Sequence, residues 1–289
     1  MILSILIPTH NRINILSKSL ESLYDSFLSI NEKELKINVI VVDDGSKDGT
    51  SEMLKNNFSE IYVINGDGNY WWTKAINEGA KFAIENLNSD YCLFWNDDIF
   101  PEKNYFLNLS KILNSNNCLV VGSKIYDFKT KELWSTTMYF NKYTGRTGYL
   151  IDEEKYNSST QFKWLTGMGV LVSKEIFDNV GYLDEDNFPQ YFGDLDFTLR
   201  ISKKGYEIFT KKELVIYNQT EYSSFVGDNL KSFIKSLKST NIGSRYNMFI
   251  RYRLLKKHVK YFLWVISFVE FYTKYIINVF IINRNKNKR

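Results

Sequence analysis

The sequence predicts an α/β protein built on a mostly parallel sheet that is flanked by helices. Short apolar runs typical of buried strands alternate with stretches of helical spacing through the first hundred residues. Several of these runs end abruptly in amides and carboxylates, at the edge where an open α/β sheet binds its ligands. The chain has 289 residues, of which 44% are hydrophobic and 16% aromatic, so it is long and apolar enough to build a substantial core.

The first half repeats a unit of one strand and one helix. The predicted strands are residues 2–7, 37–42, 61–64 and 91–95, and the predicted helices are residues 13–30, 47–58 and 72–87. We expect Pro8 to end the first strand, and Thr50 or Ser51 to cap the second helix. Strands and helices that alternate at this interval favour a doubly wound sheet with right-handed crossovers.

The second half is less regular. Helices are predicted for residues 102–115, 174–180 and 193–205, and strands for residues 118–127, part of 163–173 and 206–218. Residues 132–150 are rich in Trp, Tyr, Thr and Gly, which favours hairpins or a mobile loop, and residues 181–192 form a loop. The last predicted strand would close the sheet.

The composition excludes several kinds of site. Only two histidines occur, His10 and His258, too few for a His-rich zinc site or a Ser-His-Asp triad. Cys92 and Cys118 both lie in apolar runs, so we expect no disulfide framework and a reducing compartment. The opening segment MILSILIPTHNR lacks a basic region, so we interpret it as a buried strand and not as a signal peptide.

Charge divides the chain into a mildly acidic part and a strongly basic tail. Residues 245–289 contain eleven Lys or Arg and one Glu, a net charge of +10, which leaves −6 for residues 1–244. Within residues 251–282 the polar side chains recur at helical spacing, and the others are aromatic or aliphatic. Such a distribution suggests that the tail meets an anionic surface.

The kind of surface depends on how the tail helix lies. Glu270 and Lys274 would fall in the middle of a transmembrane span, which argues against one. We therefore expect an amphipathic helix that lies on an anionic membrane surface. A helix docked on the domain or on a second subunit is the alternative, whereas the continuous apolar side disfavours a nucleic-acid contact.

Residues 91–98, YCLFWNDD, are the stretch around which we expect the site. An apolar strand ends there in Asn96, Asp97 and Asp98. Desolvating two adjacent carboxylates is costly unless a cation meets them, and a hard divalent cation that also binds a phosphate is the natural partner. A strand-to-turn junction with solvated aspartates is the alternative.

Asp43 and Asp44 follow the second strand in the same way. A carboxylate at that edge can accept hydrogen bonds from a pyrimidine N3–H or from ribose hydroxyls. The alternative is an Asx-type turn, because the sequence Asp-Gly-Ser is good turn chemistry.

Six motifs follow one another in the chain: IPTHNR, VVDDGSKDGT, GNYWWTKAINEGAKFAI, WNDD, TGMGVLVSKEIFDNVGYLDE and FGDLDFTLR. In this order they resemble the blocks of the family two inverting glycosyltransferases, whose fold is the Rossmann-like GT-A fold. The resemblance covers about residues 1–225 and extends most closely to bacterial rhamnosyl- and galactofuranosyltransferase-like enzymes of surface polysaccharide synthesis. The GT-A fold is therefore the expected form of the α/β sheet.

The resemblance implies a nucleotide-sugar site in the first hundred residues. The residues expected to bind the donor are Pro8, Thr9, Arg12, Asp43, Asp44, Asn69, Trp72, Lys74, Asn96 and Asp97. Trp72 is expected to stack on a base or sugar, but Trp71 and Trp72 point about 100° apart on a helix, so one of them would fill core. Lys74 is a candidate diphosphate contact in the first turn of a helix, with a solvated lysine as the alternative.

The resemblance also implies a metal site. Asn96-Asp97-Asp98 occupies the D-x-D position, so Asp98 would hold Mn²⁺ or Mg²⁺ beside the donor diphosphate. Asn96 replaces a carboxylate, which is expected to weaken metal affinity. Asn218 stands where the family often has a histidine ligand and is the second expected metal ligand.

The block GDLDFTLR matches the family's E-D-x-D-x-x-x-R, with Gly193 in place of Glu. We expect Asp194 to be the catalytic base on the acceptor hydroxyl, and a helix cap is the alternative. Asp196 and Arg200 stand at i and i+4 and are expected to pair. The expected acceptor contacts are Trp164, Gly167 and Asp196, and Trp164 as a core residue is the alternative.

These expectations combine into one functional prediction. Residues 1–240 would form a glycosyltransferase domain, with a nucleotide-sugar half (1–100) and an acceptor half (101–240), and residues 241–289 a membrane-associating or oligomerising tail. The enzyme would transfer a sugar from a UDP- or dTDP-sugar to a glycan or lipid-linked acceptor at the inner face of a bacterial membrane. A nucleotidyltransferase of similar layout and a membrane-tethered, non-catalytic scaffold are the alternatives.

Overall fold

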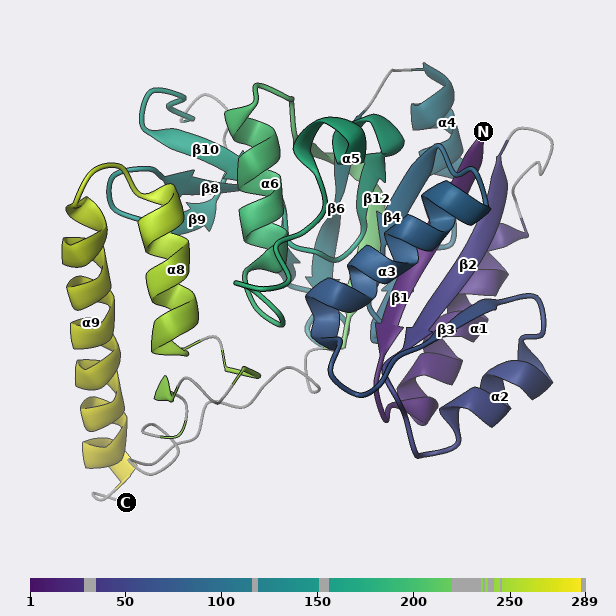
Figure 1. The fold of residues 1–289 in the computed structure, drawn as a ribbon, viewed down its shortest axis with the longest axis horizontal. Coiled ribbons are helices and arrows are strands. Elements are labelled where there is room, and N and C mark those ends of the chain that lie inside the picture. The colour runs from purple at the N-terminus through teal and green to yellow at the C-terminus, as the bar shows by residue number, and fades with distance from the viewer. Residues whose placement is uncertain are drawn as a thin grey trace.

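The computed structural model describes residues 1–28, 35–115, 119–150, 156–219 and 246–286, together with residues 235, 237, 238 and 242–244. For Ser115 and residues 278–286 only the backbone is described, and Cys118 lies outside the described residues. Within these residues a central sheet separates two layers of helices, and a smaller sheet and two C-terminal helices lie at one end (Figure 1).

The central sheet has nine strands in the described part of the chain. In chain order these are β1 (Ile2–Thr9), β2 (Lys36–Asp43), β3 (Tyr62–Asn65), β4 (Tyr91–Phe94), β5 (Ile99–Pro101), β6 (Val120–Asp127), β7 (Leu133–Ser135), β11 (Val170–Ser173) and β12 (Phe209–Asn218). Their spatial order is β3-β2-β1-β4-β11-β6-β12-β5, with β7 beside β6. The first four strands and the β6–β12 pair are parallel, whereas β11 and β5 run antiparallel to their neighbours.

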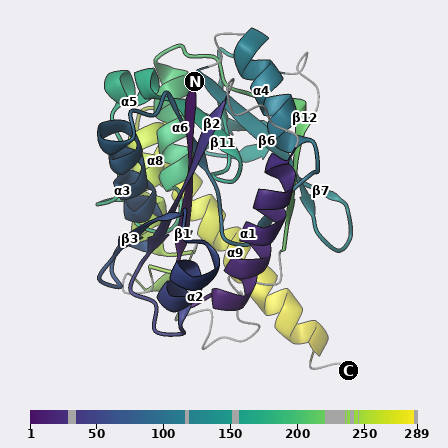
Figure 2. The same cartoon turned by 90° about the vertical axis from the view of Figure 1, so that its right-hand side faces the viewer.

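Helices cover both faces of this sheet. The helices are α1 (Ile13–Phe27), α2 (Thr50–Asn57), α3 (Trp71–Asn86), α4 (Tyr105–Ser115), α5 (Lys174–Val180) and α6 (Gly193–Lys203). One face packs on α1, α2 and α4, and the other packs on α3, α5 and α6 (Figure 2). Strand β1 shows the period of two that this requires, because Leu3, Ile5 and Ile7 face the first layer and Leu6 faces the second.

A second sheet from the middle of the chain lies beside two C-terminal helices. Strands β8 (Met138–Asn141), β9 (Thr147–Tyr149) and β10 (Gln161–Trp164) form an antiparallel sheet in the order β10-β8-β9. Helices α8 (Met248–His258) and α9 (Leu263–Lys286) follow, and α8 packs its apolar side against α6 and the second sheet. The hairpins predicted between residues 132 and 150 are therefore present.

Three local expectations are wrong. Strand β1 continues through Pro8, because β4 pairs with β1 only as far as Leu6 and the missing N–H of Pro8 therefore interrupts no ladder on that side. Helix α2 is capped one residue earlier than expected, with Gly49 at the N-cap and Asp48 accepting from the Thr50 N–H. The basic tail forms two helices with a break after His258, and its first helix is docked on the domain.

Candidate active site

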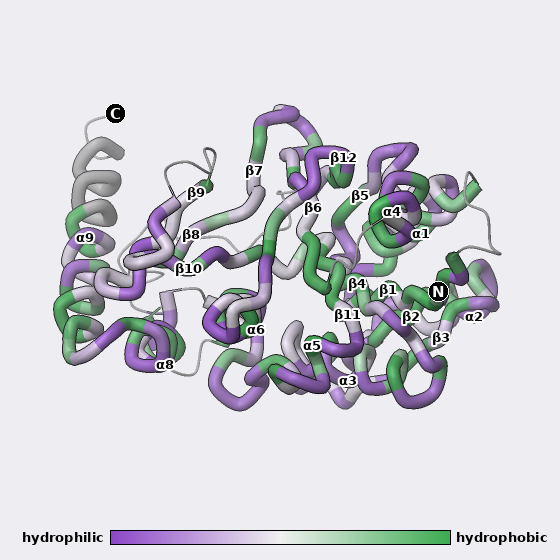
Figure 3. The backbone as a smooth tube through the Cα atoms, turned by 90° about the horizontal axis from the view of Figure 1, so that it is seen from above, coloured by the Kyte–Doolittle hydropathy of each residue, from purple (hydrophilic) through white to green (hydrophobic). Residues whose placement is uncertain are grey.

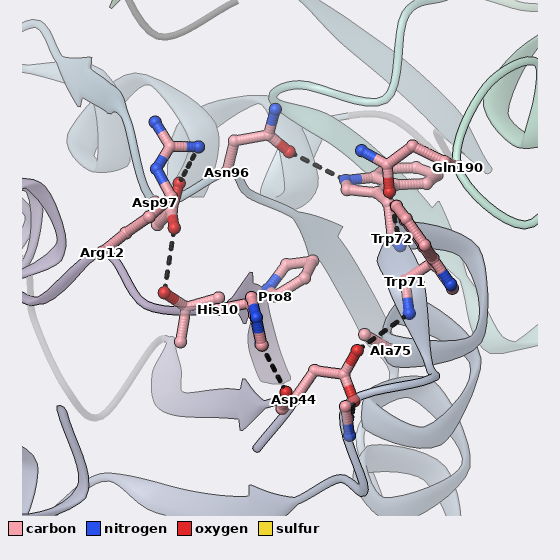
Figure 4. A pocket seen from close by; sticks show the side chains of 12 residues that line it. Pro8, His10, Arg12, Asp44, Trp71, Trp72, Ala75, Asn96, Asp97 and Gln190 are labelled. Carbon is pink, nitrogen blue, oxygen red and sulfur yellow. Dashed lines mark hydrogen bonds and ion pairs between the residues drawn. The ribbon is translucent and has the colours of Figure 1, made fainter. Parts of the chain in front are cut away.

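A pocket of about 420 Å³ lies at the ends of β1, β2 and β4, a size suited to a small organic ligand (Figure 4). The lining residues are Pro8, Thr9, His10, Arg12, Asp44, Gly68, Trp71, Trp72, Ala75, Asn96, Asp97 and Gln190. They come from the turns that follow the three parallel strands, from the start of α3 and from the loop before α6. The structure therefore brings most of the predicted donor residues to one edge of the sheet.

Arg12 and Asp97 form one wall of this pocket, and Asp98 lies beside them. Arg12 lies 3.0 Å from Asp97 Oδ1 and 2.8 Å from Asp98 Oδ2, and the Thr9 hydroxyl donates to Asp97 Oδ2 at 2.9 Å. Burial raises the pKa of Asp97, and the neighbouring charge of Asp98 adds to the rise, while Arg12 opposes it. Asp98 Oδ1 is buried and has no hydrogen-bond partner among the described residues. The solvated-turn alternative for these two aspartates therefore does not hold.

The opposite wall is aromatic. Trp71 is 39% exposed, lines the pocket and has a φ of 56°, an uncommon backbone conformation for a bulky residue. Trp72 packs edge-on against Phe94, and its indole N–H donates to Asn96 Oδ1 at 2.9 Å. The backbone N–H of Trp72 donates to Gln190 Oε1 at 3.0 Å, which ties α3 to the loop before α6. Both tryptophans line the pocket, although we expected one of them to fill core.

Asp44 shapes the floor of the pocket by holding a loop. Its carboxylate accepts hydrogen bonds from the backbone N–H groups of Gly68, Tyr70 and Trp71 at 2.8 to 3.0 Å. At Gly66 a Cβ atom would lie 2.6 Å from Asp44 Oδ1, so this close approach requires glycine. These partners lie 24 to 27 residues away in the chain, so Asp44 does not form the local Asx-type turn of the alternative but holds the backbone of Trp71 through tertiary contacts.

Asp43 has a similar structural task and does not line the pocket. It is buried, and it accepts from the Ser46 N–H and from the Ser51 hydroxyl, both at 3.0 Å. A contact between Asp43 or Asp44 and a base stays a prediction.

Asp194 lies behind the aromatic wall. Its Oδ2 accepts from the Gly167 N–H and its Oδ1 accepts from the Leu195 N–H, both at 2.8 Å. A Cβ atom at Gly167 would meet the Trp72 ring at 2.4 Å and Asp194 Cβ at 3.2 Å, so the absent side chain lets these groups approach. Burial raises the pKa of Asp194, and the two backbone hydrogen bonds oppose that rise. Asp194 is the second residue of α6 and does not cap it, because Phe192 holds the N-cap position.

Four other predicted residues lie outside the pocket lining. Asn69 is exposed on the loop, and Lys74 lies 4.4 Å above the Tyr70 ring. Trp164 is buried in the core between the second sheet and α6, and its indole N–H donates to the Tyr139 carbonyl, as its core alternative requires. Asn218 ends β12 beside Ile99, the residue that follows Asp98, so the fold brings it near the expected metal ligand.

Asp196 forms a separate, fully satisfied centre. Its Oδ2 accepts from Arg200 Nε at 2.9 Å, as expected, and its Oδ1 lies 2.7 Å from His258 Nε2 and 2.8 Å from Lys257 Nζ. Burial alone would raise the pKa of Asp196, but the hydrogen bonds from α8 and the charge of Arg200 hold it well below its usual range. Asp196 is 0% exposed, so it has no surface with which to contact an acceptor, and that expectation is wrong.

Five residues of the pocket lining were not predicted from the sequence: His10, Gly68, Trp71, Ala75 and Gln190. His10 stands inside the IPTHNR motif, and its Nδ1 lies 2.6 Å from the Asp44 carbonyl, so its place in the motif was an available signal. Trp71 was left out of the predicted donor residues, because one tryptophan of the Trp71–Trp72 pair was expected to fill core. Gln190 has no local signal, because it reaches the pocket through a tertiary contact with Trp72.

The residues at Asp98 fit a hard cation that also binds phosphate. Asp98 Oδ1, which is buried and has no hydrogen-bond partner in the described part of the chain, is an oxygen ligand of the kind that Mn²⁺ and Mg²⁺ prefer, and Mg²⁺ is commonly held by one or two carboxylates and the substrate's phosphates. No group of three or more His, Cys, Asp or Glu side chains that could hold a metal gathers among the described residues.

Comparisons with solved structures identify the fold. S. aureus TarS residues 1–349 superimposes with a TM-score of 0.57 at 16% identity, over 87% of this chain and 70% of that one. The mannosyltransferase PcManGT from Pyrobaculum calidifontis, solved in complex with GDP-Man and Mn²⁺, has a TM-score of 0.53 at 14% identity, over 88% of this chain and 61% of that one. These similarities confirm the GT-A fold.

Several curated relatives are named as glycosyltransferases. The uncharacterized glycosyltransferase YfnE of Bacillus subtilis is 31% identical over 43% of this chain, and that match spans only 31% of YfnE. A dolichyl N-acetyl-α-D-glucosaminyl phosphate 3-β-D-2,3-diacetamido-2,3-dideoxy-β-D-glucuronosyltransferase of Methanococcus voltae is 22% identical over 86% of this chain and 74% of its own length. The family model "Glycosyl transferase family 2" matches residues 4–179, which is more than half of the chain. The chain therefore belongs to glycosyl transferase family 2.

Proposed function

We propose that this protein is an inverting, metal-dependent glycosyltransferase that uses a UDP- or dTDP-sugar and extends a glycan or lipid-linked acceptor in cell-surface polysaccharide synthesis. One observation carries the proposal: the exposed Trp71 ring and the Asp97 carboxylate line a single pocket, and the adjacent Asp98 has an oxygen without a hydrogen-bond partner among the described residues. Both features suit a nucleotide-diphosphate sugar. Its base can stack on the aromatic ring, and its diphosphate requires positive charge, which a cation held by the carboxylates would supply.

The donor would lie across the pocket from Trp71 to Asp98. The Trp71 ring would stack on the base or sugar, and Arg12 would contact a phosphate oxygen from the opposite wall. Asp98, with Asn218 as the second candidate ligand, would hold Mn²⁺ or Mg²⁺, and a bound cation would stabilise the charge of the leaving diphosphate. Solved relatives support this class of ligand, since PcManGT was crystallised with GDP-Man and Mn²⁺ and TarS with UDP.

Asp194 would act as the base. Its raised pKa strengthens it as a proton acceptor, and it contacts Gly167, whose Cα lies against the ring of the pocket residue Trp72. The carboxylate would take the proton of the acceptor hydroxyl while the hydroxyl oxygen bonds to the anomeric carbon, and the bond from that carbon to the diphosphate breaks on the opposite side. Attack from opposite the leaving group inverts the anomeric configuration.

A donor panel tests the proposal. The full chain is incubated with UDP-, dTDP- and GDP-linked sugars, an acceptor lipid mixture and Mn²⁺, while nucleoside diphosphate release is followed and product configuration is read by NMR. We expect release from a UDP- or dTDP-sugar, loss of release with a chelator, and a product of inverted configuration. Release of nucleoside diphosphate from GDP-sugars alone would show that the predicted nucleotide is wrong. A product with retained anomeric configuration would contradict the inverting mechanism, and no release from any donor would favour the scaffold alternative. A rhamnosyl or galactofuranosyl specificity stays a prediction that the same panel tests.

The tail supports a proposal of peripheral membrane association. At the α8–α9 turn, Tyr261 and Phe262 are 75% and 74% exposed, next to the exposed Lys256 and Lys260. Val265, Ile266 and Val269 continue the exposed apolar face along α9 at the outer edge of the molecule (Figure 3). Exposed aromatics flanked by lysines suit the interface of an anionic bilayer. No helix in the described part of the chain combines the length and apolarity that a membrane span requires.

Vesicle sedimentation tests this association. The full chain should sediment with vesicles that contain anionic lipid and stay in solution with zwitterionic ones, and a double change of Tyr261→Ser and Phe262→Ser should release it. Self-association of the wild type that the same double change abolishes, without any vesicle binding, would instead identify the face as a subunit contact.

A further inference from the structure

Arg12 lies between Asp97 and Asp98, next to the Asp98 oxygen that is left for a divalent cation. We propose that Arg12 is a built-in counter-ion that competes with the divalent cation for this carboxylate pair, so that the protein binds the cation tightly only together with a nucleoside diphosphate. The proposal rests on the proposed function and deepens it, because it names the residue that makes metal binding depend on the donor.

Arg12 contacts both carboxylates of the Asp97–Asp98 pair. One nitrogen of its guanidinium lies 3.0 Å from Asp97 Oδ1 and the other lies 2.8 Å from Asp98 Oδ2, so the two prongs of the fork contact different carboxylates. The side chains of Asp97 and Asp98 are 5% and 11% exposed, whereas that of Arg12 is 29% exposed. The two carboxylates are therefore largely excluded from water, whereas the arginine reaches them from the more exposed edge of the pocket.

The charges at this centre do not balance. Two carboxylates face one guanidinium, and Asp98 Oδ1 has no partner among the described residues, so an oxygen remains for one more cation. A divalent cation at that oxygen would stand close to the guanidinium, and like charges repel strongly where water is excluded. While Arg12 stays on the pair, the cation binds weakly.

A nucleoside diphosphate removes this conflict. Its phosphates offer Arg12 a second anionic partner, for which the planar guanidinium is well matched, and they complete the coordination of the cation. Arg12 precedes the first residue of α1 and lines the pocket, so its side chain can turn toward a phosphate without disturbing the helix. Cation and nucleotide should therefore strengthen each other's binding equally.

Titration calorimetry of Mn²⁺ into the full chain tests this inference, with and without UDP. We expect the wild type to bind Mn²⁺ weakly alone and at least about tenfold more tightly with UDP, within the usual range of coupling between sites. Arg12→Met keeps the length of the side chain and removes its charge, so Mn²⁺ alone should bind about tenfold more tightly than to the wild type, and the effect of UDP should shrink. Arg146→Met removes the same charge from the β8–β9 turn, where Arg146 contacts Glu270, and should leave Mn²⁺ binding unchanged.

An Arg12→Met protein that binds Mn²⁺ alone no more tightly than the wild type does would overturn the inference. If this variant does not fold, Asp97→Asn serves as the new reference, and adding Arg12→Met to it should still tighten Mn²⁺ binding; no tightening overturns the inference. The readout requires no sugar transfer. If the enzyme transfers sugar but Arg12→Met does not tighten Mn²⁺ binding, the inference about Arg12 is refuted and the proposed function stands. If Arg12→Met tightens Mn²⁺ binding but the protein accepts no donor, the proposed function is refuted and the inference about Arg12 stands.

Discussion

Two buried aspartate centres of this molecule differ in the number of their cationic partners and in the direction in which the pKa of the aspartate is shifted. At the Asp97–Asp98 centre two carboxylates share one arginine, one oxygen lacks a partner in the described structure, and burial raises the pKa of Asp97. At the Asp196 centre one carboxylate receives Arg200, Lys257 and His258, and these partners lower its pKa. The first centre opens on the pocket, whereas the second has no exposed surface.

The difference shows that burial alone does not mark a functional carboxylate. Both centres are buried, and both belong to motifs that the family resemblance singles out. The two centres differ in the number of hydrogen-bond and ion-pair partners of each carboxylate. A buried carboxylate with too few partners costs stability unless a ligand supplies one, whereas a carboxylate with several cationic partners holds neighbouring elements together. Asp194, two residues from Asp196 on the same helix, differs from both, because its two oxygens accept from the backbone N–H groups of Gly167 and Leu195 and burial keeps its pKa raised.

The largest expected effect separates the two aspartates of α6. Asp194→Asn should lower kcat/KM for sugar transfer by about 10³-fold, within the range for removing a general base, with little change in thermal stability. Steady-state assays with the best donor measure it, and Asp178→Asn on α5 is the matched control, because Asp178 only pairs with Lys174 at the surface. Transfer by Asp194→Asn at the wild-type rate would remove Asp194 from the mechanism.

Asp196→Asn should act on stability. It leaves Arg200, Lys257 and His258 around a neutral group, so the free energy of unfolding should fall by about 3–5 kcal/mol, as for other broken buried ion pairs. Urea denaturation measures this loss. Nucleotide affinity should stay within about twofold at temperatures where the variant is folded, since distant sites usually act independently. A loss of affinity without a loss of stability would mean that the two centres are not separate.

Trp71→Ala sharpens the assignment of the aromatic wall. A base that stacks on an aromatic ring contributes about 1–3 kcal/mol, so UDP affinity in the presence of Mn²⁺ should fall by roughly tenfold or more. Trp164→Phe is the control, because Trp164 is core and should change stability without changing UDP affinity. Equal UDP affinities for Trp71→Ala and the wild type would place the base elsewhere in the pocket.

The smallest expected effect concerns pH and the Asp196 centre. Burial lowers the pKa of His258 below its ordinary value of 6.5, although the hydrogen bond to Asp196 opposes this, so the unfolded chain takes up a proton before the folded chain does. The contribution of His258 to stability is therefore present above pH 6.5 and is lost as pH falls below it. The difference in melting temperature between wild type and His258→Gln should shrink from pH 7.5 to pH 5.5. A difference that grows on acidification would contradict the sign of the shift.

The sequence predicted the donor half of the fold well, because its information is local. The strands and helices before residue 100 were predicted from the periodicity of their apolar residues, and the structure contains them. The motif residues Thr9, Arg12 and Asp97 meet at one edge of the sheet because parallel strands end there together. The Asp196–Arg200 pair was also predictable, since it lies within one helix.

Contacts between distant segments were not predictable in this way. His258 and Lys257 join Asp196 from a helix about sixty residues later, and Gln190 reaches Trp72 from another loop. Arg12 looked like a phosphate contact, because its motif does not show that it lies between two carboxylates. Each miss concerns a partner that only the tertiary fold supplies.

The most direct test of the contrast between the centres is the effect of Mn²⁺ on nucleotide binding in two matched variants. UDP or dTDP is titrated into the wild type, Asp98→Asn and Asp196→Asn, with and without Mn²⁺. We expect Mn²⁺ to tighten binding to the wild type and to Asp196→Asn, and to have no effect on Asp98→Asn. Full Mn²⁺ enhancement in Asp98→Asn, or its loss in folded Asp196→Asn alone, would contradict the assignment of the two centres.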